Sequence, residues 1–202
     1  MNTHYTALTG HGAGRRCICA GHGKSADQLF KMDIDSNTDI IAVNTTKYVP
    51  FCTYLLVFDD DVLKAVREGK MLLSPFSKII GPAGHGCDYQ FAFQETPRPH
   101  TSRFGHYRSG LRAVFLAADI MQYNEIYLYG YDYHPHPKVE TVDLADIRTW
   151  ESRNLPWDPA QVLDDQLEEF KDRPWPATIF QGNPMSRLQH FPNREYRSKN
   201  GL

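Results

Sequence analysis

The chain has 202 residues, of which 41% are hydrophobic and 23% are charged, as is ordinary for one globular domain with a sizeable core. The formal net charge is −2 with nine histidines counted as neutral, so no bulk attraction to a polyanion such as nucleic acid is indicated. No apolar run approaches the ~20 residues that a membrane-spanning helix needs, and the N-terminal residues lack a signal-peptide core. We therefore expect a cytoplasmic protein with no membrane partner.

The cysteines give no sign of a disulfide framework or of a metal site. The four are Cys17, Cys19, Cys52 and Cys87, and no two have the C-x-x-C spacing. Cys17 and Cys19 are two apart in an apolar run, so in a strand they face the same side. We expect four buried, reduced thiols, as in cytosolic proteins.

Short apolar runs without helical periodicity predict strands, at residues 16–21, 39–46, 54–61, 71–81, 124–133 and 176–183. Apolar residues at helical spacing predict helices, at residues 25–32, 59–70, 109–123 and 158–173, with a short helical turn in 184–193. The remaining segments have no clear period: residues 1–15 are expected to be a flexible arm, and residues 81–105 an irregular loop that is either functional or mobile. Alternation of strands and helices predicts one α/β domain over 16–202, with a layered, mostly parallel sheet.

Four of the predicted strands end in polar residues that can do chemistry. These are Gly21–Ser25, Asn44–Thr46, Asp59–Asp61 and Gly130–His136. Parallel strands deliver their carboxyl ends to one edge of a sheet, where ligands of such folds bind. The sequence therefore predicts a ligand site at this edge.

The stretch "GHGKS" at 21–25 has two interpretations. It fits neither the G-x-G-x-x-G nor the G-x-x-x-x-G-K-[ST] frame. Two glycines before a helix still let backbone N–H groups approach an anion. The same residues also suit a structural strand-to-helix turn, with Ser25 as the helix N-cap.

Three further motifs also have two interpretations each. The acids Asp59–Asp61 suit Mg²⁺ or Mn²⁺, or simply the positive end of a helix dipole. His134 and His136 in "GYDYHPHP" can exchange protons near neutral pH, or lie in a solvated loop. Arg108 in "HYRSG" can pair with a phosphate, or be a surface residue before the Ser109 N-cap.

The block "HYRSGLRAVFLAADIMQYNEIYLYGYDYH" resembles the bacterial lipooligosaccharide sialyltransferases that use CMP-sialic acid. It is also similar to related bacterial and phage glycosyltransferase-like proteins of the DUF115 kind. Those enzymes open with an apolar strand running into G-N-G-P-S, where this chain has "GHGKS", and their second strand ends in an asparagine, here Asn44. The resemblance implies a Rossmann-like, GT-A-variant three-layer fold that needs no metal.

The resemblance also implies roles for individual residues. Gly21, Gly23 and Ser25 would line the nucleotide phosphates, and His22 and Lys24, which depart from the family pattern, would mark a changed donor. The rest of the implied donor site follows in chain order: Asn44 at the nucleotide-sugar, Ser109 and Gly110 at its sugar or carboxylate, and Gly130 with Asp132 at the nucleotide end.

The implied activity is transfer of a sugar from a nucleotide-sugar, of cytidine type, to an unknown acceptor. His134 or His136 would be the general base, and Lys24 with Arg108 would meet the leaving phosphate. No cofactor is expected besides the donor, and a homo-oligomer is compatible with the sequence. Two alternatives stay open: a non-catalytic nucleotide-binding protein, and a pyrophosphokinase-like enzyme with Mg²⁺ on Asp59 and Asp61.

Overall fold

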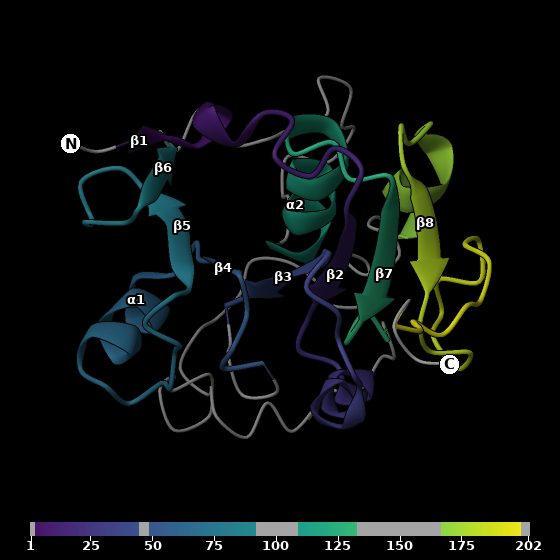
Figure 1. Cartoon of the computed structure of the whole chain (residues 1–202), viewed down its shortest axis with the longest axis horizontal. Coiled ribbons are helices and arrows are strands. Elements are labelled where there is room, and N and C mark those ends of the chain that lie inside the picture. The colour runs from purple at the N-terminus through teal and green to yellow at the C-terminus, as the bar shows by residue number, and fades with distance from the viewer. Residues whose placement is uncertain (1–2, 45–48, 92–108, 133–166, 199–202) are drawn as a thin grey trace, which may run out of the picture.

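The computed structural model describes residues 3–44, 49–91, 109–132 and 167–198. Their strands form one sheet in the order β1-β6-β5-β4-β3-β2-β7-β8, and all neighbours run parallel (Figure 1). The strands are β1 (Thr3–His4), β2 (Arg16–Ala20), β3 (Thr38–Val43), β4 (Tyr54–Leu56), β5 (Lys78–Pro82), β6 (Tyr89–Phe91), β7 (Glu125–Tyr129) and β8 (Thr178–Gln181). The predicted parallel α/β architecture is confirmed.

Helices follow or precede most strands. They are η1 (Tyr5–Leu8) and η2 (Lys24–Lys31), both 3-10 helices, α1 (Asp60–Arg67), α2 (Ser109–Phe115) and the π-helix η3 (Leu116–Ile120). Residues 167–172 are also helical, within the helix predicted at 158–173. No helix in the described ranges is long and apolar enough to cross a membrane.

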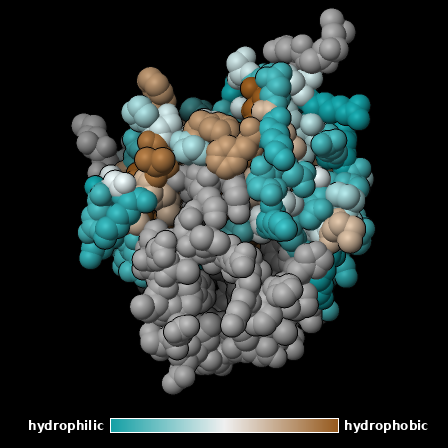
Figure 2. Space-filling view, turned by 90° about the horizontal axis from the view of Figure 1, so that it is seen from below, coloured by the Kyte–Doolittle hydropathy of each residue, from teal (hydrophilic) through white to brown (hydrophobic). Residues whose placement is uncertain are grey.

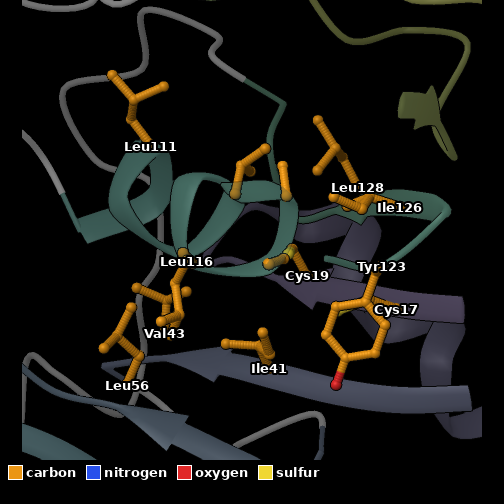
Figure 3. Packing of buried hydrophobic residues seen from close by; sticks show 14 of the residues in the cluster. Cys17, Cys19, Ile41, Val43, Leu56, Leu111, Leu116, Tyr123, Ile126 and Leu128 are labelled. Atoms are coloured by element: carbon orange, nitrogen blue, oxygen red, sulfur yellow. The ribbon is translucent and has the colours of Figure 1, made fainter. Parts of the chain in front are cut away.

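Two apolar clusters place the sheet in the middle of three layers, as expected. Cys17 and Cys19 of β2 belong to one cluster together with α2 and η3, and Figure 3 shows Leu116 of η3 pointing toward Val43 and Leu56. Ile18 and Ala20, which alternate with the cysteines, belong to the other cluster with η2 and α1. All four cysteines are free and buried, which agrees with reduced thiols.

The sequence missed the outer strands at one edge of the sheet. Residues 3–14, expected as part of a flexible arm, contain β1 and η1, and Leu8 is fully buried. β1 pairs with β6, a strand inside the segment expected to be irregular. Strands this short carry no periodicity of their own and exist because of this long-range pairing.

Several predicted boundaries were also wrong. The strand predicted at 54–61 ends at Leu56 and the one predicted at 71–81 starts at Lys78, after Pro75. η2 has Gly23, not Ser25, as its N-cap, because the Ser25 side chain bonds elsewhere. The region 184–193 forms turns and a bridge instead of a helical turn.

Two buried side chains that are uncharged at pH 7, the Cys52 thiol and the Tyr54 hydroxyl, predict that the fold loses stability at alkaline pH. Burial raises the pKa of the Cys52 thiol to about 11 and that of the Tyr54 hydroxyl to about 12, from ordinary values of 9.0 and 10.0. The unfolded chain ionises first, so this stability is fully present below pH 9 and is lost as the pH rises through the folded-state values. We expect Tyr54→Phe to flatten the fall in the free energy of unfolding between pH 10 and 12; an unchanged slope in denaturant titrations would contradict this assignment.

Candidate functional site

The carboxyl ends of four adjacent strands, in the order β4-β3-β2-β7, bring together the residues that sequence reasoning singled out. Asp59 follows β4, Asn44 follows β3, Gly21–Ser25 follows β2, and Gly130–Asp132 follows β7. The structure thus places these strand-end residues at one edge of the sheet, and hydrogen bonds link them into two connected groups.

The first group joins the glycine turn after β2 to the end of β7. Gly21 N–H donates to Tyr129 O at 2.7 Å, and Gly23 N–H donates to Gly130 O at 2.9 Å. A Cβ on Gly21 would lie 2.6 Å from Gly130 O, and one on Gly23 would lie 2.5 Å from Asp132 Oδ2. These two backbones approach so closely that side chains are excluded.

Hydrogen bonds between Ser25 and Asp132 stabilise the contact between the glycine turn and the end of β7. Asp132 Oδ2 accepts the Ser25 backbone N–H at 2.9 Å, its Oδ1 accepts the Ser25 hydroxyl, and Ser25 Oγ accepts the Gly130 N–H at 2.7 Å. Asn183, just after β8, donates from Nδ2 to Asp132 Oδ1 at 2.8 Å. Ser25 and Asp132 are both buried, so their polar atoms are used inside the protein.

Three backbone N–H groups of the 21–25 turn are already used in hydrogen bonds within the protein, which limits how the turn can bind an anion. The N–H groups of Gly21, Gly23 and Ser25 all donate to protein oxygens. The Lys24 side chain is exposed, and His22 is half-buried. A phosphate here would therefore meet the Lys24 ammonium rather than a cradle of these three N–H groups.

Asn44 is the centre of the second group. Its Nδ2 donates to Asp59 Oδ2 at 2.7 Å and to Ser109 Oγ at 3.0 Å, and its Oδ1 accepts the Phe58 N–H at 3.1 Å. Its φ of +54° is a conformation that asparagine tolerates better than most residues. Asn44 thereby ties the ends of β3 and β4 to the start of α2.

Helix α2 also contacts the β7 end, which connects the two groups. The Tyr131 hydroxyl donates to Gly110 O at 3.0 Å. At the start of α2, Ser109 thus bonds to Asn44 and the next residue, Gly110, bonds to Tyr131. The predicted donor-site residues Asn44, Ser109 and Gly110 thus meet at the start of α2, and Tyr131 links this helix start to the end of β7, where Asp132 lies.

The three acidic residues after β4, Asp59, Asp60 and Asp61, do not form one group, because they have different surroundings. Asp59 precedes α1 and accepts from Asn44, whereas Asp60 is exposed and its Oδ1 lies 3.6 Å from His85 Nδ1. Asp60 and Asp61 occupy the first turn of α1, where they complement the helix dipole. Within the ranges that the structure describes, no three His, Cys, Asp or Glu side chains are grouped to hold a metal ion.

The candidate catalytic residues Arg108, His134 and His136 lie outside the described residues. His190, the histidine that follows β8, is exposed, with its ring centroid 5.3 Å from that of Phe191.

Sequence reasoning missed two residues of this edge. Asn183 holds the Asp132 carboxylate, and the Arg187 N–H donates to Asp132 O at 3.1 Å. Asn183 is the last residue of the strand predicted at 176–183, so the expectation that strand ends carry site residues would have found it had it been applied to that strand. Arg187 gave no comparable signal, because it lies in 184–193, a segment expected to form a short helical turn.

Removing the Asp132 carboxylate should destabilise the fold as well as the site. Asp132→Ala leaves the two Ser25 donors and the Asn183 amide without their acceptor, at a cost of about 2–3 kcal/mol in the free energy of unfolding. Asp88→Ala is the matched control: its carboxylate also accepts a backbone N–H, from Ile79 at 2.8 Å, but is exposed. Urea unfolding should show a clearly smaller loss for Asp88→Ala, and equal losses would contradict the assigned role.

Comparisons with known proteins bear on the fold. No protein-family model matches the chain, and a search of curated proteins gives no match. The α-2,3-sialyltransferase from Campylobacter jejuni, in its apo form, has a TM-score of 0.51 at 15% identity, over 93% of this chain and 86% of that one. The sialyltransferase CstII from the same organism, in complex with the substrate analogue CMP-3FNeuAc, has a TM-score of 0.52 at 15% identity, over 89% and 84%. This chain therefore shares the fold of these GT-A-like sialyltransferases.

Proposed function

We propose that this chain is a glycosyltransferase that takes a sugar from a nucleotide-sugar donor bound at the carboxyl edge of β4, β3, β2 and β7. The observation that carries the proposal is the convergence of Asn44, Ser109, Gly110 and the 21–25 turn in one polar network at this edge. The similarity to a sialyltransferase solved with the substrate analogue CMP-3FNeuAc supports a cytidine-type donor.

The donor's charged end belongs at the glycine turn. Lys24 is an exposed cation in this turn, and a cation near a departing phosphate stabilises the negative charge that develops on it. Arg108, immediately before α2 in the sequence, would supply a second cation with bidentate geometry. His22 and Lys24, where the resembling family has asparagine and proline, are the positions at which donor preference should differ.

In the proposed reaction an acceptor hydroxyl oxygen attacks the anomeric carbon of the donor sugar. The bond from that carbon to the phosphate oxygen breaks, and the nucleotide departs with the bonding electrons. His134 or His136 accepts the hydroxyl proton, which a group titrating near neutral pH does well. The Asp132 network takes no proton in this scheme: it keeps the turn against the end of β7.

A donor-turnover assay tests the proposal. Release of CMP from CMP-sugars, measured against CDP- and UDP-sugars with a panel of hydroxyl acceptors, should depend on acceptor and persist in EDTA. His134→Gln and His136→Gln should separate the base, which loses turnover but keeps binding, from a bystander. Tight nucleotide binding without turnover would instead make the chain a binding protein. Activity that needs Mg²⁺ and is lost in Asp59→Asn or Asp61→Asn would point to a pyrophosphokinase-like enzyme.

A further inference from the structure

Two turns at the edge of the sheet opposite the candidate site carry large exposed apolar side chains. Phe51 precedes β4, and Leu72 and Phe76 precede β5, so these residues lie near the amino ends of the two neighbouring parallel strands. Their exposed fractions are 48% for Phe51, 77% for Leu72 and 87% for Phe76. We call these three residues the amino-edge patch. Isolated apolar residues on a surface are common, whereas such a group marks an interaction site.

Hydrogen bonds hold the two turns of the patch side by side. The Ser74 N–H donates to Pro50 O at 2.7 Å, the Lys78 N–H donates to Thr53 O at 2.9 Å, and Ser77 Oγ donates to Cys52 O. The patch is thus presented on a fixed backbone. A preformed surface loses little conformational entropy when a partner covers it.

The charges around the patch indicate what kind of partner fits. Residues 49–53 and 71–77 contain no charged side chain. The lysines adjacent to residues 71–77 in the sequence are each close to an acid: Lys70 Nζ lies 2.6 Å from Glu68 Oε2, and Lys78 Nζ lies 3.4 Å from Asp88 Oδ1. The surface seen from below carries brown and tan side chains among teal ones (Figure 2).

We propose that the amino-edge patch is the centre of an interface with a second copy of this chain. Interface cores are rich in aromatic residues and poor in charge, and a patch with internally paired lysines meets its own copy without like-charge repulsion. An anionic lipid surface would instead be attracted by cations without an acidic partner. A two-fold interface of this kind leaves the carboxyl edge open and does not depend on the proposed transferase activity.

Sedimentation velocity over the micromolar range tests this proposal. The unmodified chain should sediment as a dimer at the upper end of the range. Phe76→Ser should raise the dimer dissociation constant by at least about tenfold, because aromatic anchors dominate interface energies. Phe30→Ser removes an equally large side chain that is 58% exposed on η2 and outside the patch, and it should leave the dimer intact. A single cooperative thermal unfolding transition of Phe76→Ser would confirm that the variant is folded, even where loss of the dimer lowers its midpoint.

The variant Leu72→Lys distinguishes between two possible partners of the amino-edge patch, a second copy of the chain and a lipid surface. Two facing lysines repel across a two-fold axis, so this variant should be monomeric, whereas an added cation would strengthen binding to vesicles of phosphatidylcholine and phosphatidylserine. The proposal is overturned if the unmodified chain is monomeric throughout the range or if its dimer survives both patch substitutions. Vesicle binding that increases in Leu72→Lys without any dimer would assign the patch to a membrane surface instead.

Discussion

Replacing Gly130 with alanine should lower the free energy of unfolding by about 3 kcal/mol and abolish nucleotide binding. Gly130 has a φ of +73°, a conformation that costs an alanine about 1–2 kcal/mol. Its Cβ would also lie 2.6 Å from Gly21 O, a backbone atom that cannot turn away as a side chain would. The substitution therefore forces apart the two strand ends that form the glycine turn of the candidate site.

Gly14→Ala is the matched control for this prediction. Gly14 has a φ of +75°, but nothing lies within 4 Å of the Cβ that alanine would add. This control should lose only the conformational cost of about 1–2 kcal/mol and keep nucleotide binding. Denaturant unfolding and calorimetric titration measure both quantities. Equal losses of stability in the two alanine variants would contradict the prediction, because the clash of a Cβ at Gly130 with Gly21 O would then add nothing to the conformational cost.

The second large effect is expected at Arg16, at the amino end of β2. Its guanidinium forms a buried ion pair with Asp35, donates to Arg197 O at 2.9 Å, and lies over the Tyr196 ring at 4.7 Å. Arg16→Met leaves the Asp35 carboxylate buried without its cation, which costs about 3–5 kcal/mol. Nucleotide binding by the folded fraction should not change, because this network lies at the other end of β2 from the glycine turn.

A double variant and an exposed pair complete the test of Arg16. Arg16→Met combined with Asp35→Asn removes both charges, so it should be more stable than Arg16→Met alone. Arg194 Nη1 lies 3.4 Å from Glu125 Oε1 at the surface, and Arg194→Ala should cost about 1 kcal/mol or less. A large loss in Arg194→Ala, or a double variant as unstable as the single one, would show that charge burial is not the cause.

The central strands were predictable because local pattern and tertiary position agree there. Cys17 and Cys19 alternate with Ile18 and Ala20, and both faces of β2 are buried by helices, so a short apolar run was a reliable sign of a strand. β1 and β6 were not predictable, since two and three residues carry no period and their pairing joins positions far apart in the chain. Long-range pairing, not local preference, makes them strands.

The candidate site shows the same division. Strand-end reasoning found Asn44 and the 21–25 turn, because parallel topology alone delivers them to one edge. It could not find that Asp132 captures both Ser25 donors, which moves the N-cap of η2 to Gly23. That capture depends on a contact across 107 positions of the chain, and no local spacing predicts such a contact.

The most direct test of the central claim is calorimetric titration of CMP and a CMP-sugar into the unmodified chain and into Lys24→Ala. We expect saturable one-site binding to the unmodified chain and about tenfold weaker binding to Lys24→Ala, because one charge-assisted contact to phosphate is lost. Phe30→Ser, on the same helix and away from the turn, should bind like the unmodified chain. Absence of binding of cytidine and uridine nucleotides and their sugars at millimolar concentration would contradict a nucleotide-sugar site at this edge of the sheet.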